Sequence, residues 1–194
     1  MRKSTVIITL TILGLVAAGF LLLREVAHFQ FTRNETISSG TTASSRWPEG
    51  AAVAPHTLSY EIEGEAPLVE PVREAVEQHL DVRPAVPDET PELIIVLEET
   101  AVGWSPFRSR AEIKASALFS SNGDFDFRES RPYFFEFNAD DGQDDGLIVQ
   151  VAAEYEINDQ SAGVISRPGY LDQLADKLAQ EVANTVQTHI FAAP

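Results

Sequence analysis

The feature that most constrains this chain is an uncharged, apolar run near its start. Ser4–Leu23 holds 20 consecutive residues without a charged side chain. At 1.5 Å per residue, a helix of this length spans ~30 Å, which matches the hydrocarbon core of a bilayer. The run therefore predicts a transmembrane helix over residues 4–23. Its apolar anchoring side chains include Ile7, Leu10, Leu13, Val16, Phe20 and Leu23.

The charges that flank this run predict its orientation. Arg2 and Lys3 precede it, whereas Arg24 is followed at once by Glu25. Because positive flanks stay in the cytoplasm, we expect residues 1–3 inside and the rest of the chain outside. This pattern is typical of a single-pass signal anchor that holds a periplasmic or otherwise extracytoplasmic domain on the cell envelope.

A cleaved signal peptide is the alternative interpretation of the same segment. Val16-Ala17-Ala18 offers the small residues that a signal peptidase accepts. However, Gly19–Leu23 continues the apolar run beyond that point, where a cleaved signal would turn polar. The anchor is therefore favoured, and either interpretation places the domain outside the cytoplasm.

Composition excludes several functions. The chain has 30 acidic and 14 basic residues and a formal charge of −16, so its surface repels phosphate backbones and we expect no nucleic-acid binding. This acidity indicates a soluble surface, or else a surface for a basic partner or a cation. Cysteine is absent, which leaves no disulfide, thiolate metal site, cysteine nucleophile or lipid-modified cysteine.

Two regions follow the membrane segment. Residues 24–55 are polar and rich in small side chains, and they predict a flexible stalk with a root-mean-square span of about 30 Å. Residues 56–194 carry the periodic apolar patterns of a folded domain.

The patterns in residues 56–194 predict an α+β fold. A strand from Thr57 to Glu63 is followed by a helix that Pro67 opens and by a short apolar strand, Leu93–Leu97, typical of the covered centre of a sheet. Ser121–Asp124 has the composition of a turn, and a long helix extends over about Gly169–Ile190. Three further strands are expected at Ala111–Phe119, Tyr133–Phe137 and Leu147–Ile157. We therefore expect a mainly antiparallel sheet of four or five strands, in the order β-α-β-β-β-β-α, with two helices on one face.

Motifs of known chemistry are missing from the sequence. There is no Gly-x-Ser-x-Gly context for a serine nucleophile, and neither Gly-x-Gly-x-x-Gly nor a phosphate-binding loop for a nucleotide. We therefore expect no catalytic residue, no cofactor and no nucleotide, and we interpret the protein as non-enzymatic.

An acidic cluster at Asp140–Gly146 is the one candidate for a metal site. Asp141, Gln143 and Asp145 fit the first alternating ligands of a calcium loop, with Asp141 and Asp145 as the carboxylates. The twelfth position, where such a loop needs a glutamate, is Ala152. A solvated hairpin tip therefore explains the cluster more simply than a cation site.

A loop that combines aromatic residues with arginines is the best candidate for partner binding. Trp104, Phe107, Arg108 and Arg110 lie together in a strongly acidic chain, and tryptophan and arginine dominate protein interfaces. Alternatively, the aromatic side chains close the end of the core and the arginines pair with local acids.

The layout of an export segment followed by strand, helix, strands and helix over residues 57–190 resembles small envelope lipoproteins that assist outer-membrane or transporter assembly. The absence of cysteine departs from that group, and no motif carries the resemblance. It implies an accessory protein that binds an envelope protein and possesses no activity of its own. The competing hypothesis is an extracytoplasmic cation-binding module or an enzyme of unrecognised type.

Overall fold

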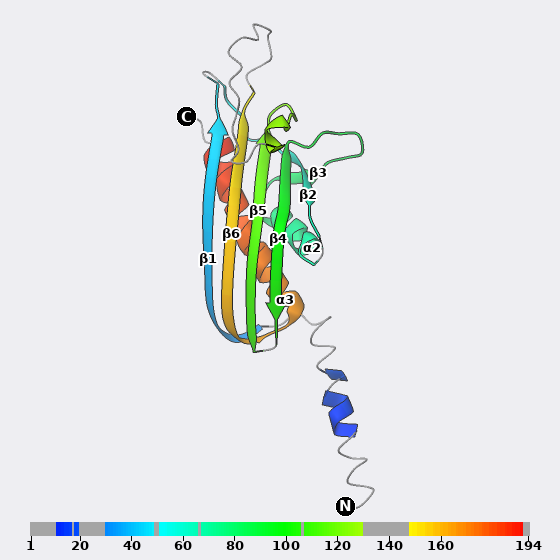
Figure 1. The fold of residues 1–194 in the computed structure, drawn as a ribbon. Coiled ribbons are helices and arrows are strands. Elements are labelled where there is room, and N and C mark those ends of the chain that lie inside the picture. The colour runs from blue at the N-terminus through cyan, green and yellow to red at the C-terminus, as the bar shows by residue number, and fades with distance from the viewer. Residues whose placement is uncertain are drawn as a thin grey trace, which may run out of the picture.

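The structure is a computed structural model, and it describes residues 11–16, 18–19, 30–48, 51–65, 67–105, 107–129 and 148–191, with residues 30–36 described by their backbone. The domain is α+β, as the sequence predicts. One six-stranded sheet with the order β1-β6-β5-β4-β2-β3 is packed on one face by two helices (Figure 1).

The four long strands of the sheet are antiparallel neighbours. They are β1 (Gln30–Arg46), β6 (Gln150–Ile165), β5 (Arg108–Ser120) and β4 (Leu93–Trp104). In β5 and β6 the odd-numbered residues face the helices, and Ile113, Ala117 and Ile157 are buried there. The alternation seen in the sequence therefore reports the two faces of the sheet correctly.

The prediction of a flexible stalk over residues 24–55 is wrong for residues 30–46, because these form the edge strand β1. The strand pairs with β6 from Gln30 opposite Ile165 to Arg46 opposite Gln150. Glu181 on the long helix fastens it further, since the carboxylate accepts hydrogen bonds from Ser39 Oγ (2.7 Å) and Thr41 Oγ1 (3.3 Å). Because β1 lies at the edge of the sheet, it pairs with β6 alone and packs few apolar side chains against the core. Its sequence therefore lacks the apolar pattern of a core strand.

The sheet is mixed, so the expectation of a mainly antiparallel sheet of four or five strands is also wrong. β2 (Leu58–Glu63) pairs in parallel with both β4 and the short edge strand β3 (Val82–Pro84). The helix α2 (Val69–His79) connects β2 to β3, and a crossover helix of this kind is what parallel neighbours require. The strand expected at Tyr133–Phe137 lies outside the described residues.

Two helices cover one face of the sheet, as predicted. The helix α3 (Arg167–Thr185) continues as a π-helical turn, η2 (Val186–Ile190), and Ser166 Oγ caps its start by accepting the Gly169 N–H (3.2 Å). The side chains that the sequence places on one stripe are all buried, namely Leu171, Leu174, Leu178, Val182, Val186 and Ile190. They form the main core together with Val72 and Val76 of α2 and with Leu68, the residue that precedes this helix.

The other face of the sheet is covered only at one end by the described residues. There the 3-10 helix η1 (Asp126–Glu129) places Phe127 over Ile94 and Leu118. Arg128 holds η1 in place through a paired contact with Glu63 of β2. Ile94 is therefore buried although it faces away from the helices, which agrees with the expectation that β4 begins as a strand covered on both sides.

The turn that precedes η1 is confirmed. Gly123 adopts φ 75°, and a Cβ at this position would lie 2.8 Å from Thr90 Cγ2, so a side chain there would be strained. The Asn122 carboxamide oxygen accepts hydrogen bonds from Ser120 Oγ (2.8 Å) and the Asp124 N–H (3.0 Å). The turn residues therefore reverse the chain as their composition predicts.

Leu13 and Val16, two of the predicted anchoring residues, lie in the helical segment 11–16 and are exposed at 67% and 66%. Ile7, Leu10, Phe20 and Leu23 fall outside the described residues. Within the part of the chain that is described, no helix is both long enough and apolar enough to span a bilayer.

Candidate functional site at the hairpin end of the sheet

The β4–β5 hairpin brings together the four residues that the sequence marks for partner binding. Backbone bonds define its tip, because Ser105 N–H donates to the Arg108 carbonyl (2.9 Å). Ser105 Oγ also donates to that carbonyl (2.5 Å) and accepts from the Arg108 N–H (3.0 Å). Since Ser105 bonds to Arg108 in three ways, the backbone of the hairpin is held in one conformation.

Trp104 belongs to the core and not to the free surface. Its side chain is partly buried against the main core cluster, and its indole Nε1–H donates to the carbonyl of Ile165, the last residue of β6 (3.1 Å). A buried indole needs such an acceptor, so this bond fixes the ring at the hairpin end of the sheet. For Trp104, the alternative interpretation that the aromatic residue closes the core applies.

Phe107, by contrast, is one of the most exposed large apolar side chains in the folded domain, with 69% of its surface accessible. Its backbone is fixed, because the Gly163 N–H of β6 donates to the Phe107 carbonyl (3.0 Å). Gly163 adopts φ 145°, where a side chain would be strained, and this conformation lets β6 turn beneath the hairpin. The hairpin therefore presents an apolar ring to solvent on a rigid support.

Arg108 and Arg110 are exposed, and their guanidinium groups make no hydrogen bond or ion pair with the described residues. Every other arginine or lysine whose side chain is described interacts with another group. In a chain with 30 acidic residues, two exposed arginines without an ion pair to a described residue are unusual. Their position in the packed domain does not explain them. The alternative that both arginines pair with local acids does not hold within the described structure.

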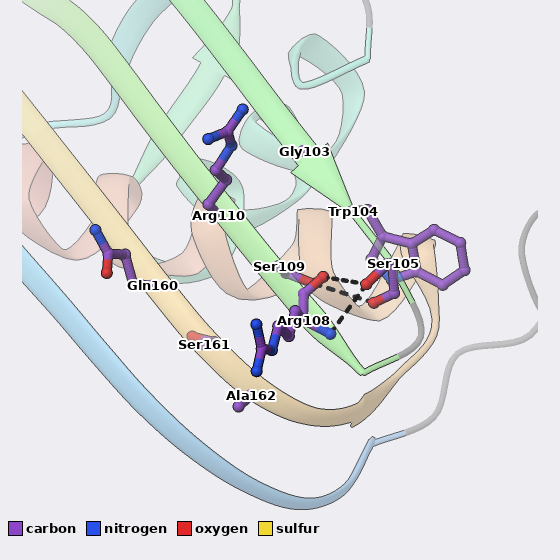
Figure 2. Close-up of a pocket in the computed structure, with 9 residues that line it drawn as sticks. All are labelled: Gly103, Trp104, Ser105, Arg108, Ser109, Arg110, Gln160, Ser161 and Ala162. Atoms are coloured by element: carbon purple, nitrogen blue, oxygen red, sulfur yellow. Dashed lines mark hydrogen bonds between the residues drawn. The ribbon is translucent and has the colours of Figure 1, made fainter.

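The two arginines flank an open hollow of about 790 Å³ on the uncovered face of the sheet (Figure 2). Gly103 forms part of its floor, and a Cβ there would lie 3.2 Å from Arg110 Cγ, so the stem of Arg110 rests across this glycine. Gln160 and Ala162 of β6 complete one side of the hollow. The lining residues include no aspartate or glutamate, which leaves the hollow positively charged.

Sequence reasoning missed the contribution of β6 to this hollow because the predicted strand ended at Ile157. β6 continues to Ile165, and the next positions on its core face are the polar residues Asp159 and Ser161. No apolar alternation remains to signal a strand there. The only available sign was that no proline interrupts the chain between Ile157 and Pro168.

These polar residues form a buried network under the hairpin end. The Asp159 carboxylate is 1% exposed and accepts hydrogen bonds from Ser161 Oγ and from the Tyr170 hydroxyl, each at 2.5 Å. Because Tyr170 lies in the first turn of α3, the network joins β6 to the start of this helix. A buried carboxylate that receives two donors is satisfied, and its role here is structural.

Acidic side chains gather further along the uncovered face, away from the hairpin. We call this group the acidic band: Glu98, Glu99, Glu112, Glu154 and Glu156. Lys114 donates to Glu99 (2.7 Å) and Ser116 Oγ donates to Glu98 (3.0 Å), which keeps two of these carboxylates in place. The uncovered face thus changes from acidic at its middle to basic at the hairpin.

The predicted metal ligands Asp141 and Asp145 lie outside the described residues. Elsewhere, within the described parts of the chain, no three histidine or carboxylate side chains come close enough together to hold a metal ion.

Comparison with known proteins adds no identity. The sequence matches no model of a known protein family, and no curated protein matches it significantly. Any functional conclusion must therefore come from the geometry of the chain itself.

Proposed function

We propose that this protein is a non-enzymatic accessory protein of the cell envelope, in which an uncleaved N-terminal helix holds an extracytoplasmic α+β domain beside the membrane, where the domain binds an envelope protein. The observation that carries the proposal is the start of β1 at Gln30, only six residues after the uncharged run ends at Leu23.

This short connection supports a role at the membrane surface. Six residues extend over at most ~20 Å, so the domain remains near the bilayer if residues 4–23 span it. A protein held in this way stays close to partners that are themselves embedded in the membrane or lie on its surface. An envelope complex is such a partner.

The uncovered face of the sheet supports binding as the activity. Its exposed half presents the acidic band on β4, β5 and β6, next to the small polar side chains of β1, such as Thr42 and Ser44. A hollow of about 420 Å³ lies among Glu98, Glu154 and Glu156. Complementary charge steers and orients protein association, so a partner with a basic surface fits this face.

Site-specific photo-crosslinking in native membranes tests the proposal. A photoreactive residue at position 158, where Asn158 is exposed beside the acidic band, should yield a defined product with another envelope protein. The matched control is position 78, because Gln78 is also exposed but lies on α2 on the opposite face. Products from both positions alike, or from neither, would argue against a partner on the uncovered face.

A further inference from the structure

We propose that the hairpin end of the domain is a second membrane contact, which binds the anionic phospholipid headgroups of the membrane that anchors the chain. The contact residues are Phe107, Arg108 and Arg110, called here the arginine hairpin. This inference rests on the proposed N-terminal anchor and adds what the hairpin does once the anchor is in place.

The first support is the position of the arginine hairpin relative to the start of the folded chain. Ala162 of β6 pairs with Arg108 on one side and with Asn34 of β1 on the other. Neighbouring strands are ~4.8 Å apart, so Arg108 lies ~10 Å from the first residues of β1. Figure 1 shows the same relation, since the β4–β5 hairpin forms the end of the domain at which β1 begins.

The second support is distance from the bilayer. β1 begins six residues after Leu23, and six residues reach at most ~20 Å. The headgroup layer on each side of the hydrocarbon core is itself about 5–8 Å thick. The end of the domain that carries the arginine hairpin is therefore within reach of the headgroups, whereas the opposite end of the long strands reaches them only if the domain lies flat on the bilayer.

The third support is the distribution of charge. Three segments meet at this end, residues 30–34, 100–111 and 160–171, and their charged residues are Arg33, Arg108, Arg110 and Arg167. The acid that lies opposite Ala111 in the sheet, Asp159, is buried. The remaining surface is strongly acidic, and the acidic band begins at Glu112 on the same face. An anionic bilayer therefore repels most of the domain and attracts this end, which orients the strands upright on the membrane.

The chemistry of the tip fits lipid better than a soluble anion. Phe107 is exposed and its backbone is held by β6, while Arg108 and Arg110 make no ion pair with the residues that the structure describes. An apolar side chain beside basic side chains is the arrangement that interfacial membrane anchors use, since the ring enters the headgroup boundary and the arginines bind phosphates. A free phosphate would use the arginines and leave the ring without a role.

This contact can be tested with the full-length chain in lipid vesicles that contain no other protein. Because the chain lacks cysteine, a fluorophore can be attached to one introduced cysteine, at Ala162→Cys beside the hairpin or at Val86→Cys, which is exposed in the loop before β4 at the other end of the strands. The labelled protein is reconstituted in brominated phosphatidylcholine vesicles with or without phosphatidylglycerol. Bromine quenches only a fluorophore that lies near the lipid.

We expect quenching at position 162 that requires phosphatidylglycerol, and none at position 86. Each basic residue near an anionic surface favours the bound state by about five-fold, so Arg108→Gln with Arg110→Gln should lower the docked-to-undocked ratio roughly 25-fold. Phe107→Ser should also reduce quenching, whereas Arg73→Gln on α2 should not. Salt at about 1 M shortens the screening length to ~3 Å and should abolish the effect.

The contradicting outcomes separate the two proposals. Protein that fails to float with vesicles of either composition refutes the anchor, and the hairpin contact falls with it. Protein that floats but shows no quenching at position 162 refutes the hairpin contact alone, as expected if the hairpin binds a protein instead. Quenching that is equal with and without phosphatidylglycerol, or insensitive to both arginines, also refutes it.

Discussion

Replacing Trp104 with alanine should destabilise the domain far more than replacing Phe107, although the two aromatic residues lie three positions apart on one hairpin. Trp104 packs against the core and donates to the Ile165 carbonyl, whereas 69% of the Phe107 surface is accessible. The sequence alone assigns them to the same patch. The structure places the Trp104 ring against the core and the Phe107 ring in solvent. The free energies of unfolding of the two alanine variants should therefore differ.

The expected magnitudes follow from burial. A tryptophan that buries ~150 Å² of apolar surface contributes about 4 kcal/mol, and its indole hydrogen bond adds about 1 kcal/mol. Because the denatured chain also buries some apolar surface, we expect Trp104→Ala to cost about 3–5 kcal/mol. Phe107→Ala removes an exposed ring and should change the free energy of unfolding by less than about 0.5 kcal/mol.

Urea unfolding of residues 30–194, followed by circular dichroism, gives the free energy of unfolding of both variants, and thermal unfolding gives their melting temperatures. For a domain of this size, each kcal/mol shifts the melting temperature by about 2–4 °C, so Trp104→Ala should melt roughly 10 °C lower than the parent. Phe107→Ala should melt within about 2 °C of the parent. Equal losses for the two variants, or a larger loss for Phe107→Ala, would refute the placement of the two rings.

Three further outcomes are expected. Tyr170→Phe removes a donor from the buried Asp159 carboxylate and should cost about 1–3 kcal/mol in urea unfolding; an unchanged midpoint would mean that the hydrogen bond is not needed. A fragment of residues 56–194 loses β1 and leaves β6 as a bare edge, so light scattering should show aggregation that a fragment of residues 30–194 does not show. Hydrogen bonds to the Ala54 carbonyl and to Glu92 raise the pKa of His56 above its usual 6.5, so the stabilisation is fully present below pH 6.5 and is lost as the pH rises through the raised value. The loss should reach at most about 0.5 kcal/mol because the pair is exposed, and it should be missing in His56→Gln; a variant with the same pH dependence would exclude His56 as the cause.

The elements that the sequence predicts well are those whose side chains bury one face. The α3 stripe and the alternation of β5 follow this rule, because each buried position lies at the helical or strand period. β1 lacks this signal, since an edge strand with serine, threonine and glycine on both faces depends on backbone pairing with β6. Its pairing partner lies more than a hundred residues away, and local patterns do not contain that information.

The parallel part of the sheet does have a signal in the sequence. A helix between two strands is the usual crossover of parallel neighbours, so β2, α2 and β4 could have been arranged correctly. The sequence could single out the residues of the candidate site, because tryptophan and arginine in an acidic chain are conspicuous. Which aromatic side chain enters the core depends on the register of the hairpin, and this register follows from the bulge at Leu97/Glu99 and the turn at Ser105.

Protease accessibility in intact cells tests the central claim most directly. The full-length chain carries a tag at its C-terminus, and protease is added outside intact cells, or outside spheroplasts if an outer membrane is present. If an uncleaved anchor holds the domain outside the cytoplasm, the tagged protein should have its full length before protease is added and should lose the tag afterwards. A cytoplasmic control protein should stay whole. A tag that survives until the cells are lysed, or a shortened protein that is released into the medium before any protease is added, would contradict the account.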